Sequence, residues 1–419
     1  MGGGPSTDPD ALPFAGLRIL DLTSWWAGPA ASGFLASLGA DVIHVEAPAH
    51  MDGVRMVGLT FGAEPSWWER SPFFHAVNPN KRDVAIDLTS PAGRALGLRL
   101  VEQVDVVIEN GTPHVLDKLG LGWDAVHAAN PHAVLVRMPA FGLDGPWRDR
   151  PGFAQNIEQS SGLAWLTGQR DDQPRIQRGP SDPNGGLHAL IGLLSVLPEP
   201  GSEDEGQLVE CALFDAALPL ASEAIVEWST NGRLLERDGN RSPDAAPQGV
   251  YRCAGHDTWL ALTIADDDQW AALATKLLDR PDLAADPVLA TIDGRRARHD
   301  ELDDVITAWA ATQDVAMAAD ALATLGIPAA AARDPRLTYR HPQFRARRYQ
   351  QVVDHPVTGP TPVPTQPFRL TGVDDWVRTP APTFGQHTDE VLRDLLGLTD
   401  DQLARLHDEG TIADRPVGV

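Results

Sequence analysis

Residues 17–46 read LRILDLTSWWAGPAASGFLASLGADVIHVE, and this stretch decides the fold. LRILDL (17–22) has the apolar density of a buried strand, AGPAASGFLASLGA (27–40) reads as a helix of small residues, and DVIHVE (41–46) as the next strand. A strand, a helix and a second strand in one short stretch predict a βαβ unit, whose two strands run parallel.

The same alternation continues beyond this unit. A helix is expected at 90–103, with Ser90 as its cap and Pro91 in its first turn. Further strands are expected at 83–88, 105–110, 132–140 and 206–213. Strands separated by helices of this length predict an α/β fold, a Rossmann-like doubly wound parallel sheet with helices on both faces.

The composition of the chain changes after Trp228, where a polar, turn-rich linker begins. VYRCAGHDTWLALTIA (250–265) then predicts two strands in a hairpin-like arrangement, and several helices follow. From Asp334 the chain is proline-rich and extended, which suggests that it returns to pack on the first domain or on another subunit. The predicted organisation is a flexible tail (1–13), a large domain (14–228), a smaller α+β domain (229–332) and a return (333–419).

Composition narrows the classes of partner. The chain of 419 residues favours two domains, and its net charge of −24 argues against nucleic acid or an anionic membrane as partner. Cys211 and Cys253 form no metal-binding spacing, so no metal is expected, and they fit a reduced cytoplasm. The apolar run 187–197 is too short to span a bilayer, and the N-terminus has no signal-peptide pattern, so a cytoplasmic protein is expected.

Several common occupants of such a sheet have no motif in this sequence. GxGxxG is missing after the first strand, which disfavours a dinucleotide site. GxxxxGK[ST], GxSxG and HExxH are missing as well, which disfavours a P-loop protein, an α/β-hydrolase and a zinc protease.

Candidate ligand-binding residues lie in the segments that follow or introduce the predicted strands, and open α/β sheets bind their ligands at the carboxyl ends of the strands. Lys81, Arg82 and Lys118, together with a helix start at Ala27, would suit a phosphorylated ligand. For Lys81 and Arg82 the alternative is a pair of solvated charges before a strand. Aromatic residues at 25 and 26 suit either stacking on a ligand or packing in a core.

PSDPNGGLHALIGLLSVL (180–197) raises the question of catalysis. Asp182 followed by Pro183 reads locally as a helix cap with proline at the first helical position. A carboxylate at a helix N-terminus is also held ionised, as a nucleophile must be. Both readings remain open on these residues alone.

Long collinear motifs carry a resemblance to a known family. They are residues 21–48, 78–88, 105–142, 181–197 and 384–398. From about Phe14 to about Leu406 the chain resembles the family III CoA-transferases, the group of formyl-CoA and carnitine-CoA transferases. The resemblance implies a large domain built from both chain ends, a smaller inserted domain and an interlocked homodimer. It also implies acyl-CoA and a free carboxylic acid as substrates, with no permanently bound cofactor.

The resemblance also assigns site residues. Asp182 takes the place of the catalytic aspartate, which would form a mixed anhydride and then an aspartyl-CoA thioester. Gln155, Gly185 and Gly186 would lie near the substrate, with the two glycines leaving open space and backbone N–H groups before Asp182. Coenzyme A would lie against Ser24, Trp25, Trp26, Ala27, Lys81, Asn110, Gly111 and Lys118.

Two alternatives stay open. α-Methylacyl-CoA racemases are similar in fold and aspartate but carry a His-Asp pair where this chain has Phe153 and Ala154, which cannot move protons. Glu158 or His188 would have to substitute. The other alternative is a non-catalytic CoA-binding assembly protein.

The glycine-rich loop of formyl-CoA transferase has no counterpart in this sequence. A lid over the active site would therefore come from another segment, such as 239–249.

Overall fold

The computed structural model describes residues 12–58, 64–198 and 204–418, and these form two compact units. Unit 1 contains the chain up to Ala164, Ile176–Asn231 and everything from Pro342 onward, so it is built from both chain ends. Unit 2 contains Trp165–Arg175 and Gly232–His341. The short segment 165–175 was not expected in the smaller unit, and the tail predicted at 1–13 lies outside the described residues except for its last two.

Unit 1 contains a six-stranded sheet in the order β3-β2-β1-β4-β5-β6. Every pair of neighbouring strands is parallel, which confirms the predicted doubly wound sheet. The strands are β1 (Arg18–Asp21), β2 (Asp41–Glu46), β3 (Arg82–Ala85), β4 (Val106–Glu109), β5 (Val134–Arg137) and β6 (Leu208–Glu210).

The strands β1 to β5 carry buried apolar residues because both faces of the sheet are covered. Side chains alternate between the faces. Leu20, with Ile43 and Val107 opposite it, belongs to one core cluster. Its neighbour Ile19 points to the other face, into a second cluster.

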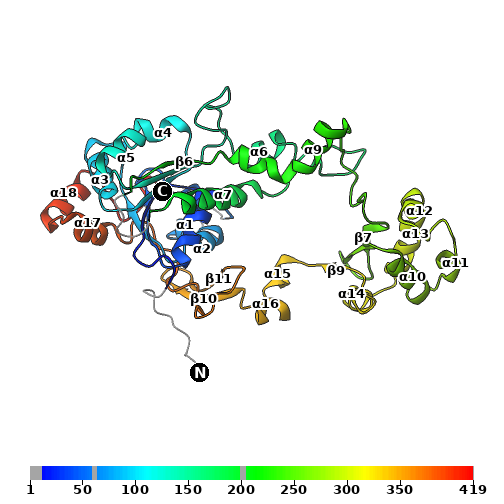
Figure 1. Ribbon diagram of the computed structural model, residues 1–419. Helices are drawn as coiled ribbons and strands as arrows, with labels where there is room; N and C mark the ends of the chain where they lie inside the picture. Colours follow the sequence, from blue (N-terminus) through cyan, green and yellow to red (C-terminus); the bar gives the residue numbers. More distant parts are fainter. Residues whose placement is uncertain (1–11, 59–63, 199–203, 419) are drawn as a thin grey trace. The chain divides into compact units, whose positions relative to one another are not determined.

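Helices cover both faces of this sheet (Figure 1). α1 and α7 lie on the Ile19 face and pack against each other, while α3, α5 and α17 cover the Leu20 face. The helices of unit 1 are α1 (Ala27–Ser37), α2 (Pro72–Val77), α3 (Pro91–Val101), α4 (Pro113–Lys118), α5 (Trp123–Ala129), α6 (Ala154–Ser160), α7 (Ser181–Val196), α8 (Leu213–Ala217), α9 (Ser222–Asn231), α16 (Pro342–Ala346), α17 (Thr388–Leu396) and α18 (Asp400–Asp408), with 3-10 turns η2 (Gly53–Met56), η3 (Trp67–Glu69) and η4 (Leu218–Ala221).

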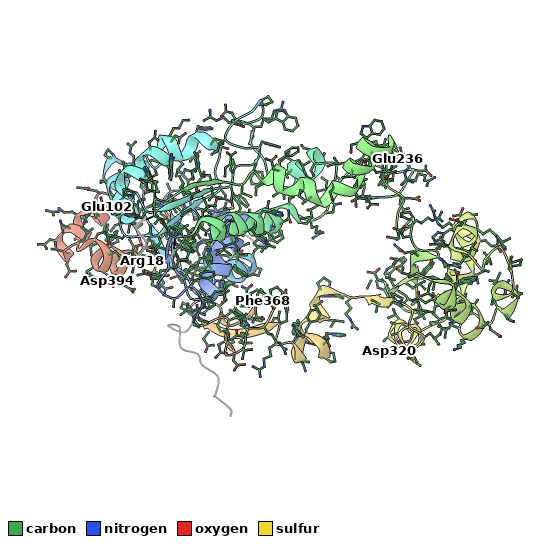
Figure 2. All side chains as sticks on the ribbon, in the orientation of Figure 1. Arg18, Glu102, Glu236, Asp320, Phe368 and Asp394 are labelled. Atoms are coloured by element: carbon green, nitrogen blue, oxygen red, sulfur yellow. The ribbon has the colours of Figure 1, made fainter. Side chains whose placement is uncertain are left out.

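The C-terminal return packs on the large unit, as expected. α17 contacts β3 and α3, and Ile412 forms a β-bridge with Ile86. Phe368, labelled in Figure 2, packs between Phe34 of α1 and Trp376. The proline-rich stretch is not uniformly extended, because β10 (Gln350–His355) and β11 (Gly359–Pro364) form an antiparallel hairpin.

Unit 2 is an α+β unit with its own core. β7 (Gln248–Arg252) and β8 (Trp259–Thr263) form the predicted antiparallel pair, and β9 (Ala329–Ala332) extends it to three strands. Its helices are α10 (Asp267–Lys276), α11 (Pro281–Ala284), α12 (Ile292–Ala297), α13 (His299–Ala310), α14 (Val315–Thr324) and α15 (Pro335–Thr338). None of the helices in the described parts of either unit has the length and apolar character that a bilayer crossing requires.

Candidate active site

A cavity of about 460 Å³ opens at the carboxyl ends of β1, β2, β3 and β4. The strand order reverses between β1 and β4, which is the position where open α/β sheets bind ligands. The cavity is lined by Leu22, Thr23, Ser24, Trp25, Val45, Glu46, Ala47, His50, Met51, Asp52, Gly53, Met56, Ile86, Leu88, Thr89, Glu109, Gly111, Val115, Leu116 and Leu119.

Ser24, which follows β1, and Asn110, which follows β4, are hydrogen-bonded to each other across this switch point. The Ser24 N–H donates to Asn110 Oδ1 at 2.9 Å, and Asn110 Nδ2 donates to the Ser24 carbonyl at 2.8 Å. Gly111 lines the cavity, and its N–H donates to Glu109 at 2.8 Å. Three residues that the sequence predicted for one site are therefore brought together.

Trp25 is held in a strained backbone conformation at the cavity wall. Its φ is +69°, in the left-handed region that larger residues rarely adopt, and its N–H donates to Asp52 Oδ1 at 2.8 Å. Its ring packs on Gly53, where a Cβ atom would lie only 2.3 Å from it, and meets Phe153 edge-to-face at 5.4 Å. The turn and its support hold the indole at one place beside the cavity.

Trp26 and Ala27 connect the cavity to α7. The Trp26 ring packs edge-to-face on Phe73 at 5.0 Å and also against Gly179, which is three residues before Asp182. Ala27 is buried, and its carbonyl lies where a Cβ on Gly186 would collide. Residues 24–27 thus run from the cavity to the helix that carries Asp182.

Lys81 lies inside the protein and does not line the cavity. Only 2% of the residue is exposed, and its Nζ lies 2.9 Å from Asp21 Oδ2 and 2.8 Å from both Ser32 Oγ and Asn78 Oδ1. An ammonium has three N–H groups, so these partners occupy all of them. This differs from the predicted contact with coenzyme A.

The expected cluster of Lys81, Arg82 and Lys118 is not assembled. Arg82 is bonded to Asp41 at 2.9 and 2.6 Å. Lys118 is exposed at the end of α4, whose Val115 and Leu116 line the cavity. Among the described residues that line this cavity there is no lysine or arginine.

A buried charge network extends inward from the cavity wall, where Glu46 and Asp52 belong to it. Its members are Asp21, His44, Glu46, Asp52, Arg55, Glu69, Lys81 and Asp83. His44 lies between two carboxylates, with Nδ1 3.4 Å from Asp21 Oδ2 and Nε2 3.7 Å from Asp52 Oδ2. Burial opposes ionisation of Asp21, but Lys81 and His44 hold its pKa well below the usual range. Asp52 joins the network to Trp25. Burial raises the pKa of Asp52 to about 6.

Part of this network has the residue types of a metal site. Ligand atoms of His44, Glu46 and Asp83 lie within 4.8 Å of one another. Arg55 already occupies this space, since its guanidinium lies 2.7 Å from Glu46 and 3.7 Å from Asp83. Burial, and then the neighbouring Glu46 carboxylate, raise the pKa of Asp83 well above its usual value. The cluster therefore reads as an ion-pair network.

Asp182 lies in the first turn of α7, because the helix begins at Ser181, two residues earlier than the expected start at Pro183. The cap position is Pro180, so the prediction that Asp182 is the cap is wrong. Its carboxylate accepts no hydrogen bond from any residue in the described part of the chain and is only partly buried. Burial, and then the negative charge of Glu158, raise the pKa of Asp182 to about 6.

The other residues expected near the substrate have different environments. Gly185 and Gly186 are buried in α7, where added Cβ atoms would meet Leu213 at 2.3 Å and the Ala27 carbonyl at 2.5 Å. They permit close helix packing and do not leave open space before Asp182. Gln155 is exposed on α6.

Sequence reasoning missed Asp52. It follows β2, and its side chain caps η2 by accepting the Val54 N–H at 3.0 Å. Ligand-binding residues were predicted after the strands at 17–22 and 105–110 and before the strand at 83–88, but none was predicted in the loop after 41–46. The Met-Asp-Gly turn at 51–53 was the available signal.

Comparison with known proteins identifies similar chains along nearly the whole length. A family model described as CoA-transferase family III matches residues 14–388. Succinyl-CoA–D-citramalate CoA-transferase of Chloroflexus aurantiacus is 34% identical over 396 residues, covering 94% of this chain and 96% of that protein. The beta subunit of succinyl-CoA–L-malate CoA-transferase from the same organism is 30% identical over 407 residues, covering 96% and 98%. A solved CAIB/BAIF family protein from Brucella suis is 30% identical with a TM-score of 0.82, covering 92% and 99%.

Replacing Lys81 tests its buried role. Lys81→Ala leaves Asp21 buried without its cation, so the free energy of unfolding should fall by about 3–5 kcal/mol, measured by urea denaturation. The exposed Lys118→Ala control should change it by less than about 0.5 kcal/mol. A Lys81→Ala protein of unchanged stability that loses only CoA affinity would return Lys81 to the ligand surface.

Proposed function

The chain belongs to CoA-transferase family III and is an enzyme of that class acting on CoA thioesters, and on this premise we propose that it transfers coenzyme A between two carboxylic acids through Asp182. The observation that carries the proposal is the unbonded, partly buried Asp182 carboxylate at the start of α7. Trp26 packs beside that start and follows directly after the residues of the cavity wall.

The proposed reaction proceeds through the aspartate side chain. The Asp182 carboxylate attacks the thioester carbonyl of an acyl-CoA, the C–S bond breaks, and a mixed anhydride and CoA thiolate form. The thiolate attacks the aspartyl carbonyl and releases the first acid as its carboxylate. The acceptor carboxylate then attacks the aspartyl-CoA thioester, whose C–S bond breaks, and a second mixed anhydride and CoA thiolate form. The thiolate finally attacks the new acyl carbonyl, the C–O bond to the aspartyl oxygen breaks, and the new acyl-CoA and the Asp182 carboxylate are released. Each step exchanges one anion for another, so no proton is consumed.

The cavity at the switch point is the proposed site of the CoA nucleotide. Ser24, Trp25, Asn110 and Gly111 are at its wall or hold its edge. The exposed Lys118 is the proposed cation for the phosphates. The pantetheine arm would follow residues 25–27 toward Asp182.

The relatives suggest which acids to test. Their names specify succinyl-CoA with D-citramalate and with L-malate. We therefore propose small dicarboxylic acids as the substrate class, with succinyl-CoA as the donor.

The geometry supports transfer over epimerisation. A racemase needs two acid/base groups flanking the α-carbon. Glu158 has no exposed surface and so does not reach a substrate. Phe153 and Ala154 stand where the racemases carry their His-Asp pair, and neither side chain can move a proton.

We also propose a homodimer that covers an apolar surface of unit 1. Leu187, Ile191 and Leu194 are exposed on one side of α7 at helical spacing. Ile225, Val226 and Trp228 are exposed on α9. Several large apolar side chains exposed on one helix suggest an interface.

The Asp182→Ala variant tests the nucleophile. The wild-type enzyme, given succinyl-CoA and a pool of free acids in D₂O, should form new acyl-CoA species without α-deuterium, and a CoA adduct should be found on the Asp182 peptide by mass spectrometry. Both signals should be lost in the variant. Deuterium at the α-carbon without new thioesters would make the protein a racemase instead.

The pH profile tests the state of the nucleophile. Asp182 must be ionised to attack, and its pKa is raised to about 6, so kcat/KM should fall as the pH falls through about 6. An ordinary carboxyl group would place this limb near pH 4. A limb near pH 4 would show that burial and Glu158 do not act on the reacting group.

Oligomeric state tests the proposed interface. Light scattering should give a mass of about twice the 45.1 kDa of one chain. Ile191→Glu places a charge in the interface and should prevent assembly, whereas Gln159→Glu at an exposed site on α6 should not. A monomeric wild-type enzyme with full activity would contradict the proposal.

A further inference from the structure

A second carboxyl group is buried beside the helix start that carries Asp182. Glu158 lies on α6 with no exposed surface, and Ser181 Oγ donates to its Oε1 at 3.0 Å. Its Oε2 is buried without a hydrogen-bond partner among the described residues. An unpaired buried oxygen is costly, so its presence at this place needs a physical account.

Glu158 is held beside the first turn of α7 by its hydrogen bond from Ser181, the residue before Asp182. α6 and α7 pack together, and the Glu158 charge, after burial, raises the pKa of Asp182. α1, which also packs on α7, has no titratable side chain. The other charged or titratable groups on the surrounding elements are Arg137 on β5, Glu210 on β6, Asp215 on α8, His188 on α7 itself and the exposed Arg178 in the preceding loop.

Three of these other groups, Arg137, Glu210 and Asp215, interact with residues other than Asp182. Arg137 is bonded to Glu109 at 2.6 Å. Glu210 and Asp215 act on Cys211. Burial, and then these two negative charges, raise the pKa of the Cys211 thiol to about 11. Glu158 therefore stands alone among the described side chains in opposing the negative charge of Asp182.

We propose that Glu158 is a positioning residue that drives Asp182 toward its covalent intermediates by repelling its negative charge. The role rests on the proposed function, because it concerns the same nucleophile. Attack on a thioester converts Asp182 from an anion into a neutral acyl group, and the repulsion disappears at that step. Interactions that penalise the resting anion more than the intermediate lower the barrier to acylation.

The Glu158→Gln variant separates charge from shape. The amide keeps the size of the side chain and an oxygen that accepts from Ser181, but it removes the charge. The midpoint for protonation of Asp182 should fall by about one pH unit, because the repulsion is lost. The midpoint is measured from the pH dependence of carbodiimide labelling of the Asp182 peptide, read by mass spectrometry. The acid limb of kcat/KM should move with it, and the plateau should fall about threefold because a less basic carboxylate attacks more slowly.

Two controls test the assignment. Ser181→Ala removes the hydrogen bond and keeps the charge, so the midpoint should stay at the wild-type value. Gln159→Ala, at an exposed site on the same helix, should change neither the midpoint nor the rate. If Glu158→Gln does not fold, Glu158→Asp withdraws the charge by one methylene and should lower the midpoint by a smaller amount.

The outcomes separate the two proposals. An unchanged midpoint in Glu158→Gln, with transfer activity intact in the wild type, overturns the role of Glu158 alone. A midpoint that shifts equally in Ser181→Ala would assign the effect to the hydrogen bond and also overturn it. Absence of CoA transfer in the wild type overturns the proposed function, while the labelling still reports on the carboxyl pair.

Discussion

The buried ion pair between Lys81 and Asp21 is the contact on which the ligand-binding edge depends. Asp21 is the last residue of β1, and Lys81 also binds Ser32 of α1 and Asn78 at the end of α2. One ammonium thus fixes the strand end, the helix that follows it and the start of β3. Burying two charges is tolerable only because each is fully paired and hydrogen-bonded. The loop 22–26 leaves β1 from this fixed point.

The network carries that constraint to the cavity wall. His44 lies between Asp21 and Asp52, and Asp52 in turn holds the N–H of Trp25. A left-handed backbone at a tryptophan persists only where its surroundings determine it. Here the Asp52 carboxylate accepts the Trp25 N–H, and the bare backbone of Gly53 leaves room for the indole to pack on it. The surface offered to a ligand is therefore set by a charge network that begins behind the cavity wall, at Asp21 and Lys81, and reaches the wall at Asp52.

The sequence predicts those features that are local. The apolar runs predicted all six parallel strands. The predicted strand DVIHVE has the same bounds as β2, because an acidic residue stands at each of its ends. Lys81 was misplaced because its partners Asp21 and Ser32 lie 60 and 49 residues away. The segment 165–175 was assigned to the wrong unit for the same reason, since Gly168 and Asp172 bond to Gly239 and Arg237. The sequence does not tell whether Gly185 and Gly186 face a ligand or a neighbouring helix, because that depends on how α7 packs in three dimensions.

The bare state of Asp182 follows from the residues that surround it. Helix starts normally offer donors to a carboxylate. Here Pro183 has no N–H, the N–H groups of Asp182 and Asn184 donate to the carbonyls of Gly179 and Pro180, and the Ser181 hydroxyl is directed to Glu158. A carboxylate with both oxygens bonded would be stable and a poor nucleophile. The proposed cycle forms and breaks bonds at the Asp182 carboxyl group. A carboxylate that accepts no hydrogen bond from the start of its own helix is the more reactive nucleophile for such a cycle.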